Sequence, residues 1–225
     1  MFSNELYLQE KFIEFKRDKL KANERILSEF NARFGNVDIV QVIVDDSHLM
    51  NYEQAALLSN YQFAKVIGYL HKKGVRTFDY LIKRTDYNDK VLSNILSKLL
   101  KADIIKEVTS KRYVISNDFQ FPILQFISYE AKLTNWKKAI LQATINKKFS
   151  SYSYVVLPLD LANRLQENKI NYFKNQNVGL IGVSKESIEY LYKPNKDRIK
   201  PSINPSFISS VAKYQLETST FSITG

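Results

Sequence analysis

The chain has 225 residues, 44% of them hydrophobic, with fourteen tyrosines and fourteen phenylalanines, which is ample for one large domain or two small ones. It has no cysteine and two histidines, which excludes disulfides, thiolate catalysis and zinc sites built from cysteine or histidine. Its formal net charge of +10 favours a polyanionic partner such as nucleic acid.

The sequence shows no signal for membrane insertion or export. No apolar run reaches the roughly eighteen residues of a membrane span, and the opening MFSNELYLQEKF is too charged for a signal peptide. We therefore expect a folded cytoplasmic protein with no membrane partner.

Residues 4–20 predict an amphipathic helix, because Leu8 and Phe12 recur at helical spacing among charged residues. Asn4 is expected to be its N-cap. Glu5 then lies in the first turn, where the helix dipole favours a carboxylate.

Residues 25–44 predict a β-hairpin with Gly35-Asn36 as its turn, since glycine and asparagine supply the positive φ that a tight turn requires. The second strand is apolar on both faces, which is typical of a central, covered strand. Asp38 interrupts it, and a buried aspartate needs a charged partner or a bound cation. Alternatively, Asp38 is solvated beside the turn. Glu29 on the first strand is a further acidic candidate.

The next segment predicts three helices and two short strands, at residues 52–73, 77–82, 89–103, 104–107 and 112–115. Thr77 is expected to cap the second helix. The third helix has an apolar stripe, which we expect to be buried, formed by Val91, Ile95, Leu96 and Leu99.

This order of helix, short helix, helix and hairpin is similar to a winged helix-turn-helix domain. The resemblance implies that the third helix enters the major groove of duplex DNA and that the hairpin contacts phosphate. It assigns six residues to DNA: Asn88, Lys90, Asn94 and Lys98 on the helix, and Lys111 and Arg112 at the hairpin. Two alternatives are a protein–protein module and a lysine-bearing helix face that is simply solvated.

A strand near residue 130 places Glu130 and Lys132 on one face beside Ser128, because side chains alternate along a strand. A carboxylate can hold Mg²⁺ against a phosphate while an ammonium stabilises developing negative charge, so the pair suits phosphodiester hydrolysis. The alternative is a solvated strand face.

The rest of the chain predicts alternating helices and strands. Thr134 or Asn135 is expected to cap a helix that carries Gln142. A buried strand at 154–158, a helix at 160–175 and strands near 178–183 and 187–194 follow. Residues 195–225 predict a wrapping or partly disordered tail, in which one short helix is expected near residues 207–214.

The longer pattern resembles the PD-(D/E)xK nuclease superfamily. The matching residues are Glu130-Ala131-Lys132-Leu133, Trp136, Ala139, Gln142-Ala143 and the apolar run 153–158. The resemblance implies a restriction-endonuclease-like α/β domain with a mixed sheet flanked by helices. It also implies a site for Mg²⁺, or Mn²⁺ as a substitute.

The resemblance also implies a role for each residue of this site. Asp38 and Glu130 bind the metal, joined by Glu5 and the carbonyl of Ala131. Lys132 positions the attacking water or stabilises the transition state. Asp38 follows Val37, where the superfamily motif has proline. Gln142 contacts the water or a phosphate.

We therefore expect a discontinuous nuclease-like domain at residues 1–45 and 119–194, a winged-helix insertion at 46–118, and a tail at 195–225. The expected function is a metal-dependent endonuclease acting on double-stranded DNA, as a homodimer if it cuts both strands. The alternatives are a non-catalytic DNA-binding regulator or assembly subunit with a nuclease-like scaffold, and an RNA nuclease.

Overall fold

The chain divides into two units, and the first is built from two stretches that are far apart in the sequence. The computed structural model describes residues 2–32, 35–45, 49–70, 74–199 and 203–221. The first unit comprises residues 1–46 and 124–199, and the second comprises residues 47–123 and 200–225. The fold is mixed α/β.

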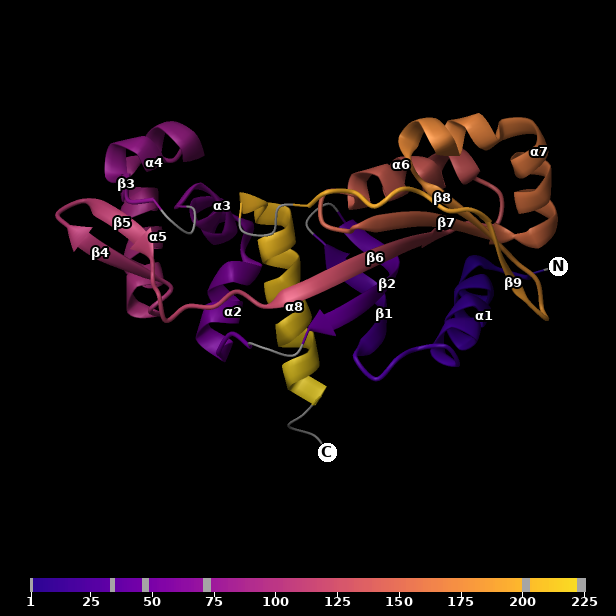
Figure 1. The fold of residues 1–225 in the computed structure, drawn as a ribbon, viewed down its shortest axis with the longest axis horizontal. Coiled ribbons are helices and arrows are strands. Elements are labelled where there is room, and N and C mark those ends of the chain that lie inside the picture. The colour runs from indigo at the N-terminus through magenta and orange to yellow at the C-terminus, as the bar shows by residue number, and fades with distance from the viewer. Residues whose placement is uncertain (1, 33–34, 46–48, 71–73, 200–202, 222–225) are drawn as a thin grey trace. The chain divides into compact units, whose positions relative to one another are not determined.

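A six-stranded mixed sheet forms the centre of the first unit (Figure 1). In sheet order the strands are β1 (Glu24–Ala32), β2 (Gly35–Asp45), β6 (Ile123–Ala131), β7 (Tyr152–Pro158), β8 (Gly179–Val183) and β9 (Ile188–Tyr192). The pairs β6–β7 and β7–β8 are parallel, whereas β1–β2 and β8–β9 are antiparallel. Strands β6, β7 and β8 therefore end at the same edge of the sheet.

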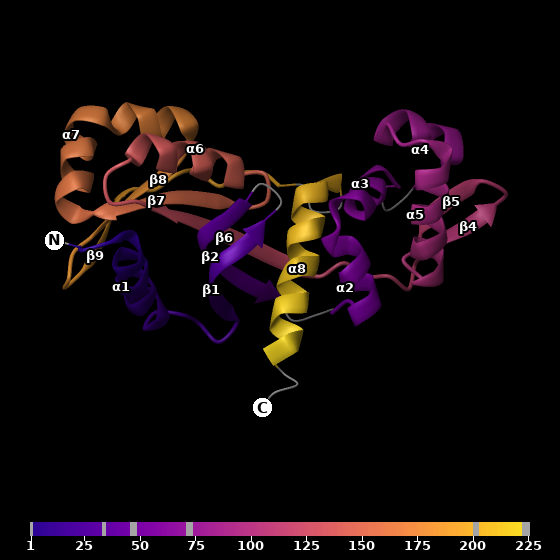
Figure 2. The same cartoon turned by 180° about the vertical axis from the view of Figure 1, so that it is seen from behind.

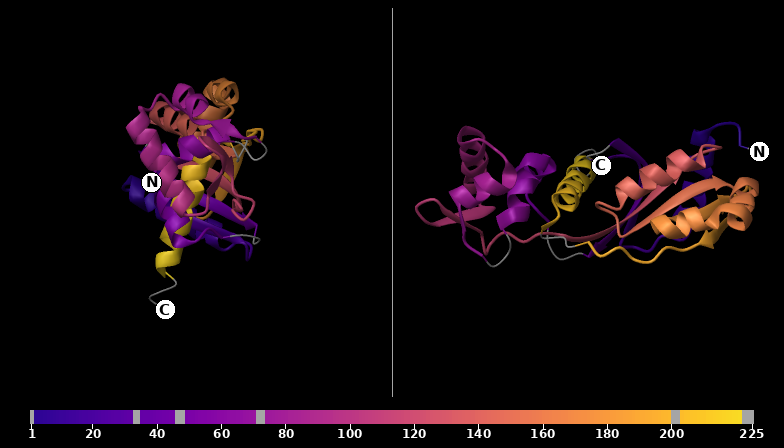
Figure 3. Two further views of the ribbon diagram at one scale, coloured as in Figure 1. Left: turned by 90° about the vertical axis from the view of Figure 1, so that its left-hand side faces the viewer. Right: turned by 90° about the horizontal axis from the view of Figure 1, so that it is seen from above.

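Helices cover both faces of this sheet (Figures 1 and 3). They are α1 (Glu5–Arg17) on one face and α6 (Trp136–Asn146) and α7 (Leu159–Gln176) on the other. Because side chains alternate along β7, Val156 packs in one cluster with Phe12 of α1, and Val155 packs in the other with Ala143 of α6. This double coverage explains why the central strands are apolar on both faces.

The predicted hairpin is present, but its turn is not at Gly35-Asn36. Both residues already pair within the ladder, Gly35 with Ala32 and Asn36 with Asn31. The connection is therefore at residues 33–34, outside the described residues. Gly35 has a φ of +123°, which an L side chain rarely adopts, so glycine is needed at the entry to β2.

The second unit combines five helices and a small sheet among its described residues (Figure 2). They are α2 (Tyr52–Ser59), α3 (Tyr61–Leu70), β3 (Arg76–Thr77), α4 (Phe78–Thr85), α5 (Asp89–Lys101), β4 (Ile105–Thr109), β5 (Arg112–Ile115) and α8 (Pro205–Phe221). The antiparallel sheet has the order β3-β5-β4. The unit extends beyond the expected boundary at residue 118, since Phe119 contacts Phe121, which contacts Phe207 of α8.

Two helices replace the single one expected at residues 52–73, whose last three residues lie outside the described ones. Asn60 ends α2 in an extended conformation, and its side chain accepts a hydrogen bond from the backbone N–H of Gln62. Asparagine competes with the helix in this way because its short side chain bonds to nearby backbone. In α5, Ile95, Leu96 and Leu99 are buried as expected, but the stripe begins at the fully buried Leu92 and not at Val91, which is only partly buried.

Residues 205–221 form α8, which contains the short helix expected near residues 207–214 and extends it at both ends, so most of the expected tail is helical. Asn204 caps the helix by accepting hydrogen bonds from the N–H groups of Ser206 and Phe207. Phe207, Ile208 and Val211 are buried at helical spacing, and α8 packs against α2 and α3 (Figure 2). The apolar stripe of α8 is buried only because α2 and α3 pack on it. The segment by itself therefore predicts no more than a short helix.

None of the helices in the described part of the chain is both long enough and apolar enough to cross a bilayer.

Candidate functional site

Asp38, Glu130 and Lys132 meet at neighbouring strands of the first unit. Asp38 lies on β2, Glu130 on β6, and Lys132 directly after β6, and β2 is the neighbour of β6 in the sheet. Asp38 and Lys132 are 94 positions apart in the chain, yet a hydrogen bond joins their side chains. Glu5 reaches the same place from the first turn of α1.

The Lys132 ammonium is surrounded by oxygen atoms. Its Nζ is 3.0 Å from Oδ2 of Asp38, 3.4 Å from Oε2 of Glu5 and 2.8 Å from the carbonyl oxygen of Ala131. Burial alone lowers the pKa of the ammonium, but the carboxylates of Asp38 and Glu5 outweigh it, so its pKa is raised above the ordinary lysine value. Lys132 is therefore a fixed positive charge at neutral pH.

Asp38 links the two strands. The same oxygen that meets Lys132 also accepts the backbone N–H of Ala131 at 2.9 Å. Asp38 is only 9% exposed. Its buried charge therefore needs partners, and the Lys132 ammonium and the Ala131 N–H supply them. Of the two sequence interpretations, the paired aspartate describes this geometry and the solvated strand end does not.

Among the carboxyl groups of the site, Glu130 has the most strongly shifted pKa. It is 1% exposed, its Oε1 accepts a hydrogen bond of 2.6 Å from the Asn146 amide, and its Oε2 is buried with no hydrogen-bond partner. Burial, and then the nearby charge of Asp38, raise the pKa of Glu130 to about 8. A cation next to Oε2 would supply the missing partner and lower this pKa.

Glu29 adds a further negative charge. It lies on β1 between the pairs Ser28–Ile39 and Phe30–Val37, so it stands opposite Asp38, where the ladder is interrupted. Its φ of 53° is in the left-handed region, which costs free energy in a non-glycine residue. Its carboxylate also raises the pKa of Glu130.

Asn146, rather than Gln142, is the amide that reaches the site from α6. No hydrogen bond joins Gln142 to Asp38, Glu130 or Lys132 in the described structure, and its Oε1 is buried without a partner. Asn146 is four residues later and therefore on the same side of the helix. That spacing was the only signal in the sequence that could have identified Asn146.

The donor set fits a hard cation. The carboxylates of Asp38 and Glu130 and the carbonyl of Ala131 are the oxygen ligands that Mg²⁺ prefers, and the orphaned Oε2 of Glu130 is the atom that a cation would satisfy. In the described residues, no group of three or more His, Cys, Asp or Glu side chains is arranged to hold a metal ion. The Glu5 carboxylate lies 3.4 Å from the Lys132 ammonium.

The residues expected to contact DNA lie in the second unit. Lys90, Asn94 and Lys98 are exposed along α5 at intervals of four, so they share one helix face. Asn88 is the N-cap of α5, and its side-chain oxygen accepts the N–H of Val91, so this oxygen already has a structural role.

The hairpin between β4 and β5 presents the other two basic residues. Lys111 has a φ of 57° at the turn, and its backbone N–H is held by Glu107 at 2.6 Å. Arg112 follows at the start of β5, and both are exposed. Neither of them, nor Lys90 or Lys98, forms an ion pair with a carboxylate in the described part of the chain.

No protein-family model, curated protein or solved structure matches this chain.

Proposed function

We propose that the protein is a metal-dependent DNA nuclease that hydrolyses phosphodiester bonds and binds duplex DNA through its second unit. The observation that carries the proposal is the buried Glu130 carboxyl, whose Oε2 has no partner and lies near the charge of Asp38. A scaffold gains no stability from such a group, whereas a cation-binding site requires one.

The order of the elements supports a restriction-endonuclease-like fold for the first unit. A helix with Glu5, a hairpin with Asp38, a strand with Glu130, a helix and a buried strand follow one another as in the superfamily that the sequence resembles. All of them belong to one mixed sheet and its covering helices.

The second unit supports a winged helix-turn-helix assignment. Residues 86–88 join α4 to α5, which matches the short turn of that motif, and the β4–β5 hairpin follows at once. The exposed Lys90 and Lys98 on α5 are then the contacts to duplex DNA, and Lys111 and Arg112 are the contacts to its phosphates.

In this proposal Asp38, Glu130 and the Ala131 carbonyl hold Mg²⁺ or Mn²⁺, and Glu5 is a further oxygen ligand. The bound ion supplies Lewis-acid activation of the phosphate and lowers the pKa of an attacking water. Asn146 orients the Glu130 carboxylate by holding its Oε1 at 2.6 Å.

Lys132 acts as a cation and not as a general base. Its pKa is raised, so it carries its proton throughout the neutral range. A fixed ammonium stabilises the charge that develops on the phosphoryl oxygens in the transition state, and it can orient the water through hydrogen bonds.

The test incubates the wild-type protein, Lys132→Ala and the control Lys169→Ala with duplex DNA, single-stranded DNA and RNA in Mg²⁺, Mn²⁺ or EDTA. Lys169 is an exposed lysine on α7. We expect metal-dependent cleavage of DNA by the wild type and the control, and a loss of at least about a hundredfold in Lys132→Ala. Lys132→Ala should bind DNA as tightly as the wild type in EDTA. A wild-type protein inert towards every nucleic acid would contradict the proposal.

One observation favours a second candidate, a non-catalytic DNA-binding regulator. Lys132 already neutralises Asp38 and contacts the Ala131 carbonyl, as expected of a scaffold that has no metal. The two candidates differ in their response to Mn²⁺, because an ion that binds only the folded protein raises its Tm. An unchanged Tm in millimolar Mn²⁺ would favour the regulator.

A further inference from the structure

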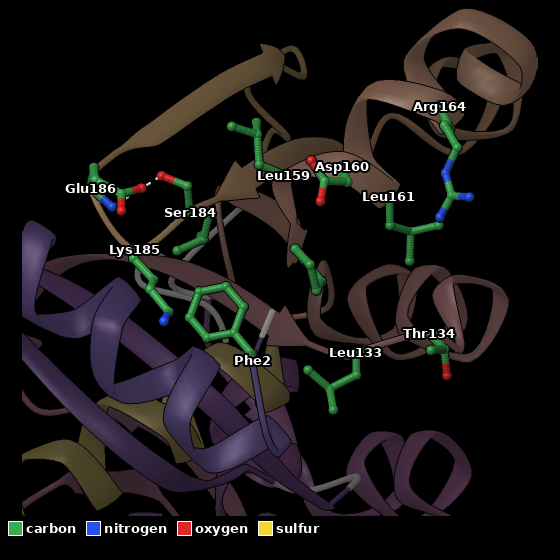
Figure 4. Close-up of a pocket in the computed structure, with 12 residues that line it drawn as sticks. Phe2, Leu133, Thr134, Leu159, Asp160, Leu161, Arg164, Ser184, Lys185 and Glu186 are labelled. Atoms are coloured by element: carbon green, nitrogen blue, oxygen red, sulfur yellow. Dashed lines mark hydrogen bonds between the residues drawn. The ribbon is translucent and has the colours of Figure 1, made fainter.

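A pocket of about 530 Å³ lies in the first unit at the edge where the parallel strands end (Figure 4). Pro158 and Val183, the last residues of β7 and β8, line it, together with Leu133, just after β6, and the start of α7. Ligands of open α/β sheets bind beyond the carboxyl ends of the strands. The volume is within the usual range for small-molecule sites.

Parts of the pocket wall and of the candidate site come from neighbouring positions in the chain. Leu133 and Thr134 of its wall directly follow Lys132, and Phe2 of its wall comes three residues before Glu5. Adjacent Cα atoms are about 3.8 Å apart, so the backbone of the pocket wall begins one residue beyond Lys132.

The lining offers three kinds of contact. An apolar wall includes the ring of Phe2 with Leu133 and Leu161, two cations are Arg164 and Lys185, and two carboxylates are Asp160 and Glu186 (Figure 4). These cations and carboxylates form no ion pairs with one another in the described structure. All four are thus available to a ligand.

A nucleotide matches this combination. Its phosphate suits the guanidinium and ammonium groups, its base can lie on the ring and leucine side chains, and carboxylates accept the amino groups of bases. A fatty ligand would leave four charges unused, and inorganic phosphate would leave the apolar wall unused.

We propose that this pocket receives one unpaired nucleotide of the substrate strand, next to the phosphate that is cleaved. The inference rests on the proposed nuclease function and defines its substrate class. A paired base would have to leave the duplex stack first, which costs free energy that an already single-stranded base does not. The preferred DNA is therefore a duplex with a single-stranded overhang at the cleavage position.

Two substitutions test the pocket. Leu161→Trp fills it from a partly exposed position on α7, and Arg164→Ala removes a cation. Lys169→Ala, on the same helix but not in the pocket wall, is the matched control. Affinities for a blunt duplex and for the same duplex with an overhang are measured by fluorescence anisotropy in EDTA, where cleavage does not interfere.

We expect the wild type and Lys169→Ala to bind the overhang DNA about tenfold more tightly than the blunt DNA, the equivalent of one stacked base. Leu161→Trp and Arg164→Ala should bind both DNAs equally. Deoxyadenosine monophosphate should raise the Tm of the wild type more than inorganic phosphate does, and this difference should vanish in Leu161→Trp.

Equal affinity of the wild type for both DNAs, or a preference that persists in both pocket variants, would overturn the inference. Failure of the proposed nuclease function is a separate outcome. It would appear as an overhang preference without cleavage under any metal, whereas cleavage without the preference would remove the pocket inference alone.

Discussion

The side-chain amide of Asn146 donates a hydrogen bond of 2.6 Å to Oε1 of Glu130. Because Oε1 is held in this way, the other oxygen of Glu130 is left buried and without a partner. The bond stabilises the ionised carboxyl, so it lowers a pKa that burial and Asp38 raise. One amide on α6 therefore orients this carboxyl and favours its charged form.

Removing that amide should weaken metal binding. Without the amide, the pKa of Glu130 in Asn146→Ala should be higher than in the wild type, where it is about 8. A larger fraction of the Glu130 carboxyl is then protonated at neutral pH, and the metal ion must displace that proton to bind. We expect the Tm increase in Mn²⁺ to be smaller than in the wild type at pH 7 and to recover as the pH is raised towards 9. Asn168→Ala, an exposed asparagine on α7, should respond like the wild type. Identical Mn²⁺ responses of Asn146→Ala and wild type at every pH would show that the amide has no such role.

Without metal, the raised pKa of Glu130 makes the protein less stable as the pH rises. Between the ordinary value of 4.5 and about 8, the folded protein holds a proton that the unfolded chain has lost. The free energy of unfolding therefore decreases through this window and changes no further above it. Each unit of pKa difference corresponds to about 1.4 kcal/mol, so the full effect is at most a few kcal/mol.

Urea unfolding in EDTA at pH 5 to 9 measures this effect. Glu130→Gln should lose this component of the pH dependence and should be more stable than the wild type at pH 8. Glu167→Gln, which changes an exposed carboxylate on α7, is the matched control and should keep the wild-type slope. A wild-type slope in Glu130→Gln would mean that another group titrates.

Breaking the pair of Asp38 and Lys132 should be costly. Asp38→Ala leaves the buried ammonium with Glu5 as its remaining carboxylate and frees the N–H of Ala131, so we expect a loss of about 3 to 5 kcal/mol in urea unfolding. In Asp38→Ala/Lys132→Met the unpaired charge is gone, and part of that loss should return. Additive single-variant effects would show that the two side chains are not coupled.

Tyr129→Phe is the control for the opposite face of β6. Its hydroxyl donates to Gln41 at 2.8 Å, so its removal should cost about 1 kcal/mol and leave the Mn²⁺ response unchanged.

The exposed lysines of α5 should bind DNA through its phosphates. Lys90→Ala and Lys98→Ala should each weaken duplex binding similarly for all sequences and reduce the slope of log K against log salt by about 1. Lys106→Ala is the control, because Lys106 already pairs with Asp118 at 2.7 Å. A salt slope that is unchanged in both α5 variants would place the DNA contact elsewhere.

Local patterns in the sequence were sufficient for much of the fold. Asn4, Thr77 and Asn135 cap helices as expected, because a cap depends on a side chain and the N–H groups two or three residues later. The alternation along β6 likewise predicted that Ser128 and Glu130 share a face, and both lie on the side of α6. Such features depend on residues that are close together in the chain, so they can be predicted without knowing the rest of the structure.

Contacts between distant segments decided the remainder. Asn146 reaches Glu130 because α6 packs over β7, the neighbour of β6, and α8 is a helix because α2 and α3 cover its apolar stripe. The raised pKa of Glu130 depends on burial and on Asp38, which lies on another strand. Burial, charge proximity and packing depend on which segments meet in space, and a pattern of nearby residues carries no information about that.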